Sequence, residues 1–166
     1  MNLREELLLE HSKAQCDKIV RWVGHSQRRF DQLINLFFTD EYRVVQRAAW
    51  PVSYCVAACP ALIQKHFSTL IHMLEQPGVS GPVKRNSVRL LQHVNIPPAH
   101  QGTIMDICFR YICDPREAAA VKAFSLTVLE KLSAVYPEIL PEIKLIIEER
   151  LDSETPAFRS RARNFF

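Results

Sequence analysis

Six histidines and five cysteines are the residues of this 166-residue chain that could ligate a metal ion or act as nucleophiles. The most closely spaced pair is Cys55 and Cys59, which would lie one helical turn apart and could supply half of a tetrahedral zinc site. No matching His or Cys pair lies nearby in the repeat register. Both cysteines also continue an apolar stripe with Val52 and Val56, where a free thiol packs as a small apolar group. The sequence therefore predicts packing cysteines and no metal site.

Nucleophilic and phosphate-binding chemistry leave no recognisable pattern either. A Ser or Cys nucleophile needs a base and a third group that orients the base. No glycine-rich elbow or oxyanion-forming turn is evident, and the four glycines of the chain are too scattered to form a P-loop. We therefore predict no catalytic residue and no cofactor. An enzyme with a site between helices is kept as an alternative.

Residues 81–92, GPVKRNSVRLLQ, permit two incompatible interpretations. Pro82 to Asn86 resemble the P-x-K-R-N core of the mobile catalytic loop in the fumarase and adenylosuccinate lyase superfamily. That loop has Ser-Ser-x-Met before the proline and a second proline after the asparagine, whereas this chain has GVSG before Pro82 and Ser87 after Asn86. Enzymes of that superfamily are also far longer than this chain. The other interpretation is that the stretch begins an amphipathic helix.

Apolar residues recur at helical spacing along the whole chain, and no segment shows the strict alternation of a half-buried strand. The pattern also repeats, because Val45, Val83 and Val121 stand 38 positions apart and three further sets keep the same step. These sets are Val52, Leu90 and Val128; Val56, Val94 and Leu132; and Leu70, Cys108 and Ile146. Such a period, with two helices per repeat, is typical of an α-solenoid. Residues 81–92 would then begin the second helix of a repeat.

Two segments show the repeat best, LINLFFTDEYRVVQRAAW and ICFRYICDPREAAAVKAF. Each combines an apolar helix, a turn with Asp or Asp-Pro, and a second helix with a basic residue near small apolar ones. In this pattern the chain resembles the HEAT-repeat family over nearly its whole length. The resemblance implies an all-α fold, a single domain over residues 1–166. That domain would be a right-handed α-α superhelix of about four helical pairs plus an N-terminal helix.

The expected N-terminal helix covers about residues 3–23. The expected pairs are 26–38 with 40–58, 60–75 with 81–95, 99–113 with 115–135, and 137–151 with 156–166. Asp40, Asp114 and Asp152 stand at the turns, where a carboxylate can accept hydrogen bonds from the exposed N–H groups of the following helix. Each aspartate is therefore predicted to cap that helix.

Basic and aromatic residues fall outside the apolar register of the second helices. In residues 40–58 they lie along one side of the helix, and cations occupy related places in the later repeats. The residues are Arg43, Arg47, Trp50, Tyr54, Lys84, Arg85, Lys122 and Arg161. Because the second helices of HEAT solenoids line the concave surface, the resemblance implies that these residues form a basic groove. The alternative is that the cations pair with turn carboxylates or are solvated, and Trp50 suits the core equally well.

The composition, with 48% apolar and 23% charged residues, is that of an ordinary globular protein. The start MNLREELLLEH has glutamates where a signal peptide would need basic and then apolar residues. No apolar run reaches the roughly 18 residues that a bilayer requires. Five cysteines without a C-x-x-C pair favour free thiols in a reducing compartment. We therefore expect a cytoplasmic protein.

These features predict a non-catalytic scaffold that binds another macromolecule, in the first place a protein, through the groove. Nucleic acid is the alternative partner, because some HEAT-like proteins that resemble the alkylpurine DNA glycosylases hold a duplex on a basic concave face. A modest net charge of +3 weighs against it, as do the acids of the C-terminal half. These acids are Glu130, Glu138, Glu142, Glu148 and Glu149. No membrane contact is expected, and the oligomeric state is left open.

Overall fold

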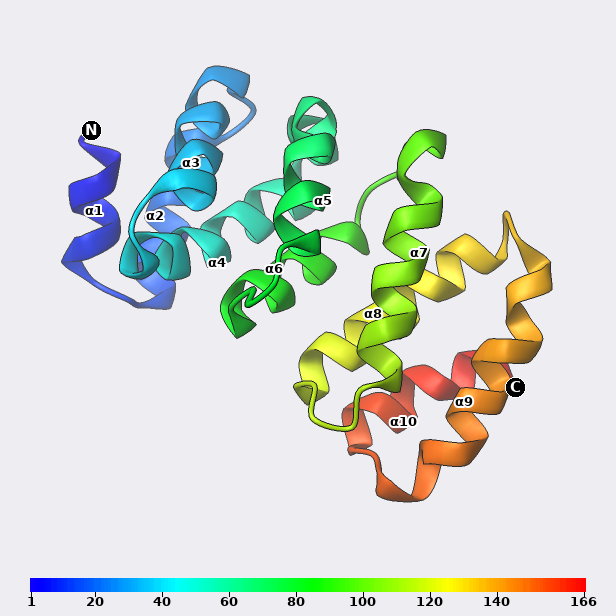
Figure 1. Ribbon diagram of the computed structural model, residues 1–166. Coiled ribbons are helices and arrows are strands. Elements are labelled where there is room, and N and C mark those ends of the chain that lie inside the picture. Colours follow the sequence, from blue (N-terminus) through cyan, green and yellow to red (C-terminus); the bar gives the residue numbers. More distant parts are fainter. The chain divides into compact units, whose positions relative to one another are not determined.

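The structure, a computed structural model, describes all residues, 1–166, and contains helices and no strands (Figure 1). The all-α prediction is therefore confirmed. The chain divides into two compact units, unit 1 (Met1–Asn95) and unit 2 (Ile96–Phe166), and each has its own buried apolar core. The expectation of one domain over residues 1–166 stays a prediction.

Unit 1 is built around one long helix, α4. Its elements are α1 (Leu3–Leu9), α2 (Lys13–Val23), α3 (Gln27–Thr39), α4 (Tyr42–Ala58), η1 (Pro60–His66), α5 (Phe67–Glu75) and α6 (Gly81–Leu91). α4 contacts α1, α2, α3, η1 and α6, so it reaches most of the unit. Phe30 and Phe37 of α3 and Val44 of α4 are fully buried, and the two helices pack against each other. The predicted pairing of 26–38 with 40–58 is thus present as α3 and α4.

Unit 2 is built around α8. Its elements are α7 (Pro98–Cys113), α8 (Ala119–Ser133), η2 (Pro137–Ile139), α9 (Leu140–Arg150), η3 (Leu151–Ser153), α10 (Pro156–Ala162) and η4 (Arg163–Phe165). α8 packs against α7 and α10. Ile104 of α7, Leu126 of α8 and Phe158 of α10 are fully buried in this core. The short α10 is therefore anchored to the unit by an aromatic side chain.

Residues that the 38-residue sequence repeat aligns occupy equivalent positions in the core, as one of the aligned sets shows. Val52 in α4, Leu90 in α6 and Val128 in α8 are all 0% exposed. Within unit 1, α4 contacts α6, so successive second helices are neighbours, as stacked repeats require. Residues 81–91 form α6, and the helical interpretation of this stretch is confirmed.

Helix ends differ from the prediction in two respects. The expected helix 3–23 is two helices, because the chain extends at Glu10 and restarts at Ser12, whose hydroxyl accepts a hydrogen bond from the N–H of Gln15 at 3.1 Å. The predicted aspartate caps are also wrong. Asp40 accepts from the adjacent N–H of Glu41 at 2.7 Å, and α4 has no side-chain cap.

The other two aspartates likewise leave the following helix uncapped. Asp114 accepts a hydrogen bond from the N–H of Arg116 at 2.9 Å, within the turn, while α8 begins only at Ala119. Asp152 lies in η3, and Thr155 caps α10 by accepting from the N–H of Phe158 at 3.3 Å. Each turn continues beyond its aspartate before the helix begins, which places the carboxylate too early to reach the first free N–H groups.

Candidate partner-binding site

Arg47, predicted to line a groove, binds the end of another helix. Its Nη1 donates to the backbone carbonyl of Leu8 at 2.7 Å and to that of Leu7 at 3.1 Å. These carbonyls belong to the last turn of α1, where backbone oxygens lack partners and a cation is favourable. Arg47 is therefore half-buried and ties α4 to α1, so it is not free to meet a partner.

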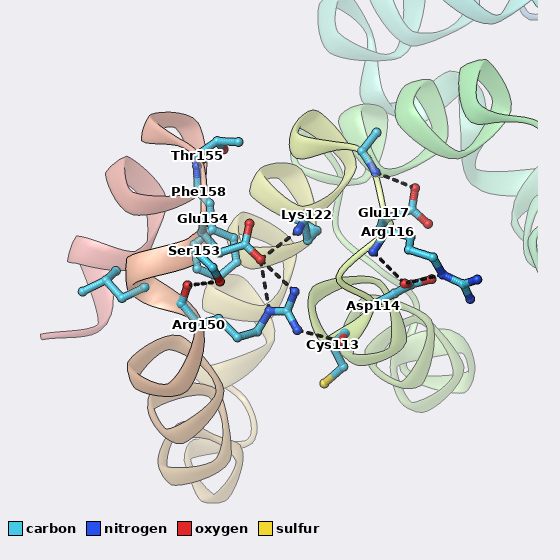
Figure 2. A network of polar contacts seen from close by, with 12 residues as sticks. Cys113, Asp114, Arg116, Glu117, Lys122, Arg150, Ser153, Glu154, Thr155 and Phe158 are labelled. Atoms are coloured by element: carbon cyan, nitrogen blue, oxygen red, sulfur yellow. Dashed lines mark hydrogen bonds and ion pairs between the residues drawn. The ribbon is translucent and has the colours of Figure 1, made fainter.

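Lys122 was expected in the same groove, and this expectation is wrong. It is only 4% exposed and forms a buried ion pair, with its Nζ 2.7 Å from Oε1 of Glu154 (Figure 2). The same oxygen accepts from Nε and Nη2 of Arg150 at 3.0 and 2.9 Å. Arg150 also donates from Nη1 to the carbonyl of Cys113 at 2.9 Å. Lys122 thus belongs to a network that links α7, α8, α9 and the turn between η3 and α10.

Three further predicted cations have different surroundings. Arg43 is exposed near the start of α4, and Lys84 is half-buried in α6. Arg161, in α10 of unit 2, donates from Nη1 to the hydroxyl of Thr127 at 3.1 Å. None of these three side chains is among the lining residues of the pocket described next.

The other three predicted residues, Trp50, Tyr54 and Arg85, do meet around one pocket of about 280 Å³ in unit 1. α4 supplies the wall with the aromatic rings, and α6 supplies the wall with the guanidinium groups. We call this the aromatic–arginine pocket. Its lining residues are His11, Gln46, Trp50, Tyr54, Pro82, Arg85, Asn86 and Arg89.

Tyr54 lies between two cations. Arg89 donates from Nη2 to the Tyr54 hydroxyl at 3.1 Å, and its guanidinium carbon is 4.7 Å from the ring centroid. The Nζ of Lys13, which is ion-paired with Asp17, is also 4.7 Å from that centroid. A side-chain hydrogen bond with Trp50 and the nearby charges of Arg89 and Lys13 lower the pKa of Tyr54, against the opposing effect of burial. The ring thus sits in a positive local field.

Trp50 forms the centre of a short row of rings. Its centroid is 5.7 Å from the His11 ring, at 58°, and 6.2 Å from the Tyr54 ring. Such tilted and edge-on arrangements are the favourable ones for aromatic pairs. Trp50 is half-buried, so its ring is packed at one side and reaches the pocket at the other.

Asn86 fixes the position of α6 relative to α4. The residue is 4% exposed; its Nδ2 donates to the carbonyl of Pro82 at 2.8 Å and its Oδ1 accepts from the Ser53 hydroxyl at 3.3 Å. Because both ends of the amide are used, the pocket wall formed by α6 is held in place.

The charge of the pocket is one-sided. Arg85 is exposed and Arg89 half-buried, and no aspartate or glutamate is among the lining residues. An arginine presents several N–H donors in a planar fork that matches a carboxylate or a phosphate. The arrangement can therefore bind an anionic group next to an aromatic surface.

A comparison with protein-family models gives one match, described as HEAT repeat domain, over residues 3–166. The chain belongs to the HEAT repeat family. The predicted family is thus confirmed over nearly the whole chain. No curated protein and no solved structure gives a significant match. In this HEAT repeat domain, no helix is both long and apolar enough to cross a membrane.

Sequence reasoning missed His11 and Arg89 as pocket residues. Arg89 follows Arg85 by four positions in α6, so helical spacing alone would have placed the two side chains on one face. His11 lies in the extended link between α1 and α2, which was predicted as continuous helix, and no pattern in the sequence would have directed it towards α4.

The cysteines of the HEAT repeat domain are free, and their burial differs. Cys55 is 1% exposed, and burial raises the pKa of its thiol to about 12, whereas Cys59 is half-buried. No group of three or more His, Cys, Asp or Glu side chains is placed to hold a metal ion.

A second pocket of about 610 Å³ lies in unit 2, between α9, η3 and α10. It is lined by Ile147, Glu148, Leu151, Asp152, Arg159, Ala162, Arg163 and Phe166. Its charges are of both signs, and Arg159 donates to the backbone carbonyls of Leu151 and Asp152 at 3.0 and 3.1 Å. The aromatic–arginine pocket is therefore the more one-sided of the two in charge.

Proposed function

We propose that this HEAT repeat domain is a non-catalytic scaffold that binds a protein through the surface of α4 and α6 in unit 1. Domains of this family are typically protein-binding scaffolds. The observation that supports this surface is the aromatic–arginine pocket, in which Trp50, Tyr54, Arg85 and Arg89 stand together without a carboxylate.

The residue types favour a protein partner. Tryptophan, tyrosine and arginine are the side chains that most often dominate the binding energy of protein interfaces, especially around well-packed pockets. A nucleic-acid backbone would call for several cations in a row. Arg47 binds backbone carbonyls and Lys122 binds Glu154, so fewer of the predicted cations are left to contact phosphates.

Capture of proteins from cells that express this chain tests the proposal. The bait would be the full chain, compared with Arg85→Glu and with the matched control Arg28→Glu, a charge reversal at an exposed position of α3. We expect Arg85→Glu to lose a protein that wild type and Arg28→Glu both retain. Direct binding of that protein, once purified, would then be measured by calorimetry.

Two results would contradict the proposal. One is an identical set of captured proteins for all three baits. The other is binding of duplex DNA or RNA that weakens steeply between two salt concentrations and is lost in Arg85→Glu, because that dependence is typical of phosphate contacts.

A further inference from the structure

We propose that the aromatic–arginine pocket receives a carboxylate side chain from an acidic peptide segment of the partner. This rests on the proposed function, which requires only that a protein binds to α4 and α6. It adds the chemistry of the group that enters the pocket.

The two arginines carry the first step. Arg85 and Arg89 stand four positions apart on α6, where like charges face each other and destabilise a helix. The guanidinium group of Arg85 makes no hydrogen bond or ion pair, and that of Arg89 contacts only the neutral hydroxyl and the ring of Tyr54. An incoming carboxylate would remove the repulsion and accept charge-assisted hydrogen bonds from both guanidinium groups.

The remaining lining residues suit a peptide. The carboxamide of Gln46 makes no hydrogen bond within the chain, so it can pair with a peptide N–H or carbonyl. Trp50 and Pro82 add apolar surface for a neighbouring side chain of the segment. The volume of about 280 Å³ is just below the usual size of small-molecule sites, which suits one or two side chains.

The position of Arg89 is also set before binding. Its guanidinium is held over the Tyr54 ring and on the Tyr54 hydroxyl, and Asn86 holds α6 against α4. A cation that is already positioned loses less conformational entropy when its anion arrives. Of the two arginines, Arg89 therefore orients the carboxylate, and the exposed Arg85 then adds a second ion pair to it.

The test uses hexaglutamate as the probe and hexaglutamine as the uncharged control, with the full chain followed by nitrogen–proton NMR. The chain has two tryptophans, Trp22 and Trp50, and the variant Trp22→Phe assigns their indole N–H signals. We expect hexaglutamate to shift the Trp50 signal and to leave the Trp22 signal in place, whereas hexaglutamine shifts neither.

Arg85→Gln should weaken the binding of hexaglutamate about tenfold, and Arg85→Lys less, because lysine keeps the charge but lacks the planar fork of N–H donors. Arg28→Gln is the matched control and should bind as wild type does.

Three results would overturn the proposal. The first is no shift of Trp50 with hexaglutamate at millimolar concentration. The second is equal binding of hexaglutamate by wild type and Arg85→Gln. The third is a shift of Trp50 only with a phosphoserine peptide, which would assign the pocket to phosphate. If any of these occurs while Arg85→Glu still loses a captured protein, the proposed function stands and only the carboxylate assignment fails.

Discussion

At the scale of single residues, one oxygen of Glu154 carries an unusual share of the polar contacts in unit 2. Oε1 accepts three hydrogen bonds, one from Lys122 and two from Arg150, and the Glu154 side chain is 3% exposed. A buried charge is tolerated only when it is paired and hydrogen-bonded. The carboxylate is therefore the group on which both cations depend.

We predict that Glu154→Gln destabilises the chain by about 3–5 kcal/mol, because it leaves two cations without their acid. Lys122→Met should cost less, since Arg150 still balances Glu154 and the methionine fills similar space. Urea unfolding followed by circular dichroism measures the free energy of unfolding of both variants. A larger loss for Lys122→Met than for Glu154→Gln would show that the lysine, rather than the carboxylate, holds the network together.

Acid should destabilise the protein in part through Glu154 and Asp31, two carboxylates with lowered pKa values. Burial alone would raise the pKa of both groups, but hydrogen bonds from Lys122 and Arg150 lower that of Glu154, and those from Lys65, Gln27 and His66 lower that of Asp31 to about 2. Their ordinary values are 4.5 and 3.8, so below these values the unfolded chain binds more protons than the folded one.

The stability from both groups is therefore complete above about pH 4.5 and is lost as the pH falls towards 2. Unfolding free energies measured by urea titration at several pH values, from about 7 down to about 2.5, check this prediction. The double variant Asp31→Asn and Glu154→Gln should show a shallower decline. A stability that is constant between pH 5 and pH 3 would contradict the prediction.

At the scale of elements, the break between α1 and α2 leaves the last backbone carbonyls of α1 to a side chain from another helix. α1 has seven residues, too few for a helix that is stable alone, and no basic residue in its last turn. Arg47 supplies the missing cation from α4 and bonds two of the terminal carbonyls. The helix is thus completed by a residue 39 positions away from Leu8.

We predict that Arg47→Met loosens α1 and costs about 1.5–3 kcal/mol, the usual value of hydrogen bonds to charged groups. In this variant, amide hydrogen exchange should accelerate in residues 3–9 and should stay nearly unchanged in α3. The matched control is Arg43→Met, one turn earlier on α4 and exposed, which should change neither quantity. Equal effects of the two variants would contradict the assignment.

Repeat positions could be predicted from sequence, and helix ends could not. The 38-residue step identified Val52, Leu90 and Val128 as core because burial of an apolar face is a periodic property that every repeat must satisfy. The cap of α10 is Thr155 instead of Asp152, because a turn three residues longer shifts which side chain meets the first N–H groups. Such local turn geometry leaves no periodic trace.

The candidate site was predicted in part, for a related reason. Trp50, Tyr54 and Arg85 could be placed because helical spacing sets their direction relative to the apolar face. Lys122 stands at a comparable sequence position, yet it is buried by an acid 32 residues later in the chain. Whether a cation is exposed depends on such a distant partner, and spacing along one helix does not reveal it.

At the scale of the whole molecule, each of the two units has its own buried core. All lining residues of the aromatic–arginine pocket, from His11 to Arg89, belong to unit 1. The proposed binding surface therefore needs only the helices of that unit.

We predict that residues 1–95 alone keep a helical circular dichroism spectrum and unfold cooperatively. The same fragment with Val52→Ala is the control, since loss of a fully buried side chain should lower its melting temperature clearly. A fragment without helical signal would show that unit 1 does not fold by itself.

Because the cysteines are buried to different degrees, the rates at which they are alkylated report how often each unit opens. Burial raises the pKa of Cys16 to about 11 and of Cys55 to about 12 in unit 1, and that of Cys108 to about 12 in unit 2, so these thiols are protonated and covered at neutral pH. Cys113 is exposed and reacts without any opening. Thiol-specific alkylation should therefore modify Cys113 first and the buried thiols only when their surroundings open. The order in which Cys55 and Cys108 are labelled would then tell which of the two units opens more often under native conditions.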